Sequence, residues 1–175
     1  VTGCSGFPFK SYPTDMESAL NLDHPTPGSS VLDLGIGTGN LALLFQAQHC
    51  HISGIDSSPA MIARAKLKLP YVHLAIRDLR NGLPSDFPHR FYRFVSAYTF
   101  HHFPSDEKVQ LIQRILQDHL QPGGRLVIAD LAFSDAASED ALRQSMGSDW
   151  AQKYYRLADE SLTALARWVY PLPAL

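Results

Sequence analysis

The sequence predicts an α/β fold in which a doubly wound, mostly parallel sheet is flanked by helices. Three observations support this prediction. Strand-like runs alternate with segments of helical periodicity, turns containing Gly and Pro separate them, and one strand leads into a glycine-rich turn that opens a helix. The chain has 175 residues, 45% of them hydrophobic, which is enough for one sizeable core. We therefore expect residues 1–175 to form a single domain.

The expected elements follow one another in a regular order. Ser58 before Pro59 is typical of a helix start, and apolar residues recur at helical spacing in 40–48. The first half is thus predicted to contain strands over 30–34, 52–56 and 71–76 and helices over 40–48 and 60–67. The second half is predicted to contain a strand over 91–98, a helix over 105–120, a strand over 125–131 and a helical segment over 134–175 that is interrupted near Gly147. The apolar face of the helix over 105–120 is expected to comprise Val109, Ile112, Ile115 and Leu116.

Composition excludes several function classes. The formal net charge of −2 leaves no excess of basic residues to neutralise phosphates, so nucleic acid is not expected as a partner. No window approaches the roughly 20 apolar residues of a membrane helix, and the first ten residues lack the order of a signal peptide. We expect a cytoplasmic protein that makes no membrane contact. Cys4 and Cys50 form no cluster with metal-ligand spacing, so no metal site is expected.

The turn Gly35-Ile36-Gly37-Thr38-Gly39 lies between the first predicted strand and the first predicted helix, where open α/β sheets bind nucleotides. Residues 37–42 also satisfy the dinucleotide pattern GxGxxA, with Asp56 at the spacing expected for a ribose contact. A nicotinamide-dependent oxidoreductase is therefore one interpretation. Asp33, just before the glycines, favours another, because a nearby carboxylate suits a cationic sulfonium ligand better than a pyrophosphate.

Four motifs in order resemble those of the class I S-adenosylmethionine-dependent methyltransferases, which have a Rossmann-like fold. They are Val31-Leu32-Asp33-Leu34-Gly35-Ile36-Gly37-Thr38-Gly39, Ile55-Asp56-Ser57-Ser58-Pro59-Ala60-Met61, Asp78 with Leu79, and Pro122-Gly123-Gly124-Arg125-Leu126. The resemblance implies S-adenosyl-L-methionine as the cofactor, held by Asp33, Gly35, Gly37, Gly39, Asp56, Ser57, Met61, Asp78, Leu79 and Ala97. It further implies that Asp56 holds the ribose hydroxyls, Ser57 and Met61 flank the adenine, Asp78 accepts the adenine amino group and Leu79 covers the ring.

Candidate catalytic residues follow the fourth and fifth predicted strands. His101 and His102 lie in an aromatic loop that resembles the acceptor side of methyltransferases acting on small molecules. Histidine suits a general base at neutral pH, and His101 is the better candidate. The alternative is that both histidines hydrogen-bond locally and pack the loop. Asp130 is expected to orient the acceptor or to cap a turn. The expected reaction is in-line transfer of a methyl group to a small-molecule acceptor.

The sequence also departs from the family pattern. Arg93 follows Tyr92 where the family commonly has an acidic residue, residues 1–28 match only part of an N-terminal lid, and the usual C-terminal β-hairpin has no room after Trp168. Residues 29–133 would then form the cofactor-binding core, with the fifth strand at an exposed edge that a second subunit could cover in a homodimer. A further alternative is a fragment that binds S-adenosylmethionine but turns over weakly or not at all.

Overall fold

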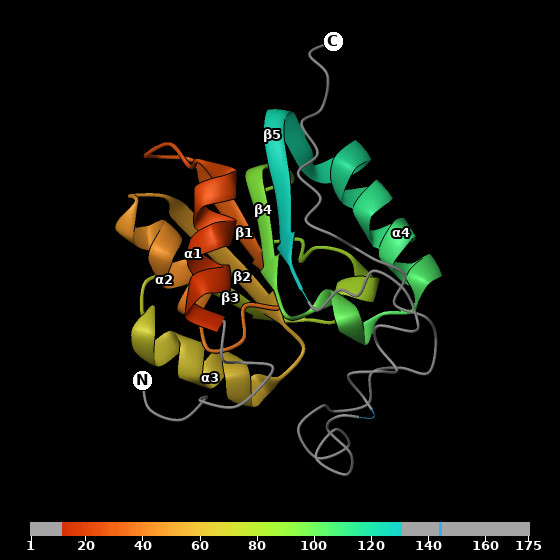
Figure 1. Ribbon diagram of the computed structural model, residues 1–175, viewed down its shortest axis with the longest axis horizontal. Coiled ribbons are helices and arrows are strands. Elements are labelled where there is room, and N and C mark those ends of the chain that lie inside the picture. The colour runs from red at the N-terminus through yellow and green to blue at the C-terminus, as the bar shows by residue number, and fades with distance from the viewer. Residues whose placement is uncertain (1–11, 131–143, 145–175) are drawn as a thin grey trace.

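The computed structural model describes residues 12–130 and residue 144, and within them five strands form one parallel sheet (Figure 1). The strands are β1 (Ser30–Leu34), β2 (His51–Asp56), β3 (His73–Ile76), β4 (Phe91–Ala97) and β5 (Leu120–Ala129). The α-helices are α1 (Tyr12–Asp23), α2 (Asn40–Ala47), α3 (Pro59–Lys68) and α4 (Ser105–Arg114). The predicted fold class is confirmed.

The strand order is β3-β2-β1-β4-β5. The chain proceeds outward from β1 through β2 to β3 and then returns to place β4 beside β1, so the order reverses between these two strands. Asp33 of β1 pairs in register with Val95 of β4 at this point. In open α/β sheets the crevice beyond the carboxyl ends of such a strand pair is where ligands bind. The fold therefore places the glycine turn after β1 at the expected ligand crevice.

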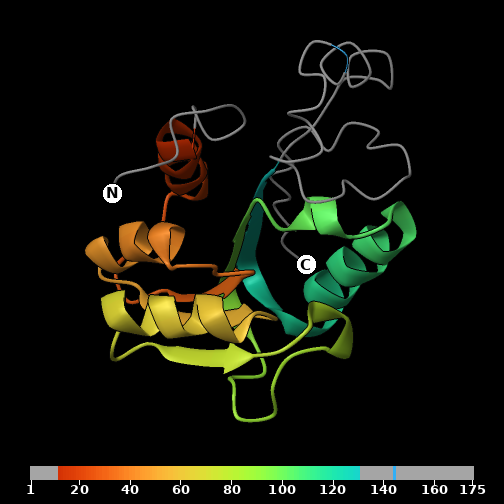
Figure 2. The ribbon, with the colours of Figure 1, turned by 90° about the horizontal axis from the view of Figure 1, so that it is seen from below.

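Helices cover both faces of the sheet. Figure 2 shows α1, α2 and α3 on one side of the sheet and α4 on the other. Each face has its own apolar cluster, one including Val31 and Phe45 and the other including Leu32 and Phe94, all with 0% exposure. Because both faces are buried, the strands are apolar over consecutive residues instead of alternating with polar ones.

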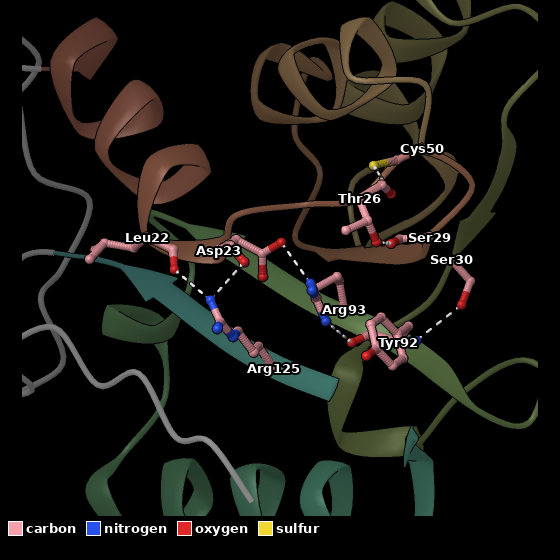
Figure 3. A network of polar contacts seen from close by, with 9 residues as sticks. All are labelled: Leu22, Asp23, Thr26, Ser29, Ser30, Cys50, Tyr92, Arg93 and Arg125. Carbon is pink, nitrogen blue, oxygen red and sulfur yellow. Dashed lines mark hydrogen bonds and ion pairs between the residues drawn. The ribbon is translucent and has the colours of Figure 1, made fainter. Parts of the chain in front are cut away.

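A buried polar network attaches the end of α1 to the sheet (Figure 3). Arg93 Nε of β4 donates to Asp23 Oδ2 at 2.9 Å, and Arg125 of β5 donates to the carbonyls of Leu22 and Asp23 at 3.2 and 3.0 Å. Burial raises the pKa of Asp23 to about 6, although Arg93 favours the carboxylate. The unusual basic residue at the start of β4 is thus compensated by an acid from α1.

The segment after β4 differs in detail from its prediction. The α-helix ends at Arg114 and is followed by a π-helical turn over Ile115–His119, so it is shorter than the predicted 105–120. Val109 is 53% exposed, which makes the predicted apolar face wrong at that position, and Lys108 is buried in its place with 5% exposure. The turn predicted to precede the fifth strand lies within β5 as an irregularity. The register between β4 and β5 shifts there, since Phe91 pairs with Leu120 and Arg93 pairs with Arg125.

Several predicted features fall outside the described residues: the beginning of the N-terminal lid, the helical segment over 134–175, and the place where a C-terminal hairpin would follow. Within residues 12–130, β5 does lie at one edge of the sheet. No helix in this range has the length and apolar character to cross a bilayer. The same residues contain no group of His, Cys, Asp and Glu arranged for a metal ion.

Candidate functional site

The glycine turn is fixed by bonds to β2. The N–H groups of Gly35 and Ile36 both donate to the Ile55 carbonyl, at 2.8 and 2.9 Å. Gly35 has φ +72°, and a Cβ at this residue would overlap the Thr99 side chain, so only glycine fits here. The loop after β4 therefore packs directly on the turn and closes one side of the crevice.

Asp56, at the end of β2, accepts two backbone hydrogen bonds. Its Oδ2 accepts from Gly37 N–H and its Oδ1 accepts from Ser58 N–H, both at 2.8 Å. Gly37 itself has φ +54° and open space where a Cβ would be, with no atom nearer than the Gly35 carbonyl oxygen at 4.0 Å. The carboxylate is thus held at the carboxyl end of β2 beside an open stretch of backbone.

Asp33 is the most deeply buried carboxyl group of the site, with 1% exposure. Its Oδ2 has no hydrogen-bond partner among the described residues. Burial, together with the nearby charge of Asp56, raises its pKa to about 8, while a hydrogen bond from the backbone of Ala42 acts in the opposite direction. Asp33 is therefore largely protonated at neutral pH, and a cationic group placed nearby would favour its ionised form.

Two of the predicted adenine contacts are already engaged within the protein. Asp78 caps the 3₁₀ turn Leu79–Asn81 by accepting from Arg80 N–H at 2.9 Å, and Arg80 Nη1 lies 3.1 Å from its Oδ2. Leu79 is 5% exposed and its side chain packs in an apolar core cluster. Both assignments stay predictions.

The remaining predicted cofactor residues lie around the same crevice. Ser57 is exposed and Met61 is 37% exposed on the first turn of α3, whose N-cap is Ser58. Gly39 directly precedes α2, and Ala97 ends β4, two residues beyond the pair formed by Asp33 and Val95.

On the other side of the reversal point, His101 and Asp130 form a double contact. His101 N–H donates to Asp130 Oδ2 at 2.9 Å, and His101 Nδ1 lies 2.7 Å from Asp130 Oδ1. The two side chains are 12% and 4% exposed. A carboxylate only accepts hydrogen bonds, so Nδ1 is the donor in this contact, and in the neutral form of the ring Nε2 is the unprotonated nitrogen.

His102 stacks against His101 with 4.0 Å between the ring centroids. Its pKa is lowered, first by partial desolvation and then by the charge of His101, while Asp130 and Asp56 oppose this shift. The charge of Asp56 acts on His102, so the end of β2 and the histidine loop lie within electrostatic range of each other. The structure thus brings together the predicted residues on both sides of the reversal point.

Comparison with known proteins decides between the two interpretations of the glycine turn. Residues 31–124 match the family described as "Methyltransferase domain". The chain belongs to the class I S-adenosylmethionine-dependent methyltransferases. S-adenosylmethionine is the cofactor of this family, and the nicotinamide interpretation has no comparable support.

Three similar methyltransferases illustrate the relationship. An uncharacterized methyltransferase from Alkaliphilus oremlandii is 31% identical over 87% of this chain and 67% of its own. The S-adenosylmethionine-bound amino pentose methyltransferase of calicheamicin biosynthesis from Micromonospora echinaspora has a TM-score of 0.55, with 25% identity over 71% of this chain and 51% of its own. The plantazolicin methyltransferase solved with S-adenosylhomocysteine has a TM-score of 0.59, with 20% identity over 81% of this chain and 52% of its own. The chain spans 58–68% of the length of the curated relatives it matches.

Sequence reasoning missed the contact of Thr99 with the glycine turn and the burial of Lys108. Thr99 contacts the glycine turn, donating from Oγ1 to the Ala97 carbonyl at 3.2 Å and the Gly35 carbonyl at 3.4 Å. Lys108 is buried on α4, and its charge interacts with Asp130. The signal for this burial in the sequence is helical spacing, because Leu111 and Ile115, three and seven residues after Lys108, are apolar.

Proposed function

We propose that this protein transfers the methyl group of S-adenosylmethionine to a small-molecule acceptor, with His101 as the general base. The observation that carries the proposal is the double contact between His101 and Asp130, because it fixes the imidazole through Nδ1, and a neutral ring held in this way has its unprotonated nitrogen at Nε2. The acceptor atom attacks the methyl carbon in line, and the carbon–sulfur bond breaks with its electron pair on sulfur. The acceptor proton passes to His101 Nε2.

A general base is needed only for acceptors that lose a proton during the transfer, so the proposal favours a hydroxyl or thiol acceptor. Two structurally similar proteins are named as methyltransferases of an amino pentose and of plantazolicin, which supports a small acceptor. The net charge of −2 argues against nucleic acid as the acceptor. Asp130 orients the imidazole in this proposal, and His102 packs against it.

On the cofactor side we assign roles by position. Asp56 would accept both ribose hydroxyls, since its Oδ2 is held by the N–H of Gly37, a residue with open space at its Cβ position. Gly35, Gly37 and Gly39 would provide closely approachable backbone, and Asp33 would interact with the positive charge of the ligand. Ser57, Met61 and Ala97 would line the adenosine, with Asp78 and Leu79 at the adenine end.

Calorimetry tests the cofactor half of the proposal. We expect binding of S-adenosylmethionine and S-adenosylhomocysteine and no heat with NAD. Tight NAD binding without a response to the other two ligands would overturn it. The acceptor half is tested by following transfer of a labelled methyl group to a set of small hydroxyl and thiol compounds, which also distinguishes an enzyme from a binding fragment.

The variant His101→Gln then tests the base. We expect kcat to fall by about 10²–10⁴ while affinity for S-adenosylhomocysteine stays within twofold. His102→Gln is the matched control, since it changes the adjacent ring and is expected to change kcat much less. Unchanged turnover in His101→Gln would show that no proton is removed by this residue.

The position of β5 at one edge of the sheet formed by the described residues supports a further proposal, that a second copy of the chain pairs there. A homodimer in sedimentation experiments that is lost with a proline at Val127 would support it, and a monomer at all concentrations would overturn it.

A further inference from the structure

Tyr98, the residue that follows β4, has a strained backbone. Its φ is +53°, in the left-handed region that glycine adopts readily and bulky residues rarely adopt. Contacts on both sides hold this conformation: Tyr98 N–H donates to the Ala129 carbonyl at 2.9 Å, and the next residue, Thr99, packs on the turn at Gly35. Backbone strain of this kind is concentrated at ligand sites, where the surrounding structure enforces it.

The strained backbone determines the face of the sheet on which the Tyr98 side chain lies. Side chains of an extended strand alternate between the two faces, so Tyr98 would point to the face opposite that of Ala97. Both residues instead pack against one apolar cluster, which includes Val31 and Phe45 and to which α1, α2 and α3 contribute. The left-handed residue therefore keeps its aromatic ring on the side of α1 and does not turn it towards α4.

The proposed base lies on the other side of the same strand end. His101 belongs to a 3₁₀ turn whose Phe100 and whose following residue, Phe103, are buried in the apolar cluster that α4 covers. Tyr98 and His101 thus flank the carboxyl end of β4 from opposite faces of the sheet.

The strand order relates this position to the charged end of the cofactor. In the proposed binding mode the adenine lies at the end of β3 and the ribose at Asp56, at the end of β2. The sheet continues from β2 to β1 and then to β4, so the sulfonium would follow at the glycine turn, beside the end of β4. Tyr98 is the first side chain after that end, and it is only partly buried.

We propose that the Tyr98 ring contacts the methylsulfonium group of S-adenosylmethionine and lets the protein distinguish this cationic cofactor from its neutral product, S-adenosylhomocysteine. The face of an aromatic ring attracts a cation that lies within about 6 Å of its centroid. The thioether of the product carries no charge and gains no such attraction. A requirement for the ring explains a tyrosine at a position where glycine would avoid the strain. The inference rests on the proposed binding mode of the cofactor and does not depend on the role of His101.

Calorimetry with S-adenosylmethionine and S-adenosylhomocysteine at one pH tests the contact through the ratio of the two dissociation constants. In Tyr98→Leu we expect the preference for S-adenosylmethionine to fall by about threefold or more relative to the wild type. Tyr98→Phe retains the ring and is expected to retain the wild-type ratio. A side chain that only packs would change both affinities by the same factor, so an unchanged ratio in Tyr98→Leu would overturn the proposal.

Tyr98→Gly covers the case in which Tyr98→Leu does not fold. Glycine adopts a positive φ without steric cost, so this variant removes the ring and the strain together and is expected to lose the preference while remaining folded. His49→Gly is the matched control, because His49 has φ +60° in the turn that leads to the amino end of β2, at the opposite edge of the sheet. We expect the wild-type ratio in His49→Gly. The wild-type ratio in Tyr98→Gly would overturn the proposal.

The same titrations separate this inference from the proposed function. Binding of neither ligand to the wild type would overturn the cofactor binding mode and the Tyr98 contact with it. Binding of both ligands with one ratio in the wild type, Tyr98→Leu and Tyr98→Gly would overturn the contact alone.

Discussion

Arg93 and Asp23 form an ion pair in the interior, 70 residues apart in sequence, with side chains 6% and 0% exposed and 2.9 Å between Nε and Oδ2 (Figure 3). Asp23→Ala leaves the Arg93 guanidinium buried without its partner. We expect this variant to lose about 3–5 kcal/mol of unfolding free energy, measured by urea denaturation.

The double variant Asp23→Leu with Arg93→Met removes both charges and is expected to be more stable than either single variant. The control is the exposed pair of His73 and Asp86, whose side chains are 45% and 66% exposed. Asp86→Ala is expected to cost about 1 kcal/mol or less. A similar small loss in Asp23→Ala would show that the buried pair does not anchor α1.

Asp33 makes stability depend on pH. Its pKa is raised from 3.8 to about 8 in the folded protein, so folding retains a proton that the unfolded chain releases near pH 4. This contribution is fully present below pH 4 and is lost as pH rises through 8. Asp33→Asn carries no such proton, and we expect its stability relative to the wild type to improve steadily between pH 5 and pH 9.

Denaturant titrations of both proteins across this pH range provide the measurement, and their difference removes the contribution of every other group. A difference that does not change with pH would mean that the Asp33 carboxyl is ionised in the folded state.

The proton held by Asp33 is also expected to be released when a cationic ligand binds. The binding enthalpy of S-adenosylmethionine at pH 7 should therefore depend on the ionisation enthalpy of the buffer in the wild type but not in Asp33→Asn.

Much of the framework is predictable because it depends on local signals. The apolar run before Gly35 predicts β1, and Ser58 before Pro59 predicts the start of α3 to within one residue. The positions of Asp33 and Asp56 at strand ends follow from the same pattern. In a parallel sheet these ends share one edge, so the crevice could be located without the structure.

The rest depends on contacts between distant segments, which no local pattern contains. The pairing of Arg93 with Asp23 requires the end of α1 to lie on β4. Helical spacing in α4 fits either side of the buried stripe, so the predicted face includes Val109, whereas Lys108 is the buried residue in the structure. Likewise, the role of Asp78 as a cap of its own turn arises from Arg80, which the resemblance did not include.

Asp56 is predicted to control cofactor affinity. Asp56→Ala removes the proposed acceptor of both ribose hydroxyls and also releases Gly37 N–H from its 2.8 Å bond. We expect the affinity for S-adenosylhomocysteine to fall at least tenfold by calorimetry, which corresponds to about 1.4 kcal/mol. Ser58→Ala is the matched control, because it removes the cap of α3, at a cost of about 1 kcal/mol in stability, without touching the carboxylate. Equal affinities in Asp56→Ala and Ser58→Ala would place the ribose elsewhere.

Gly35 and Gly37 are predicted to respond differently to the same substitution. Both have positive φ, so alanine at either costs about 1–2 kcal/mol in backbone strain. Only at Gly35 does the new Cβ overlap another side chain, that of Thr99. Gly35→Ala should therefore lose clearly more thermal stability than Gly37→Ala, and adding Thr99→Ala should restore part of the loss, since it removes the Oγ1 and Cγ2 atoms that collide. Gly37→Ala should instead weaken cofactor binding, because its Cβ enters the open space beside Asp56. Equal melting temperatures for the two single variants, or no rescue by Thr99→Ala, would contradict the packing of the loop after β4 on the glycine turn.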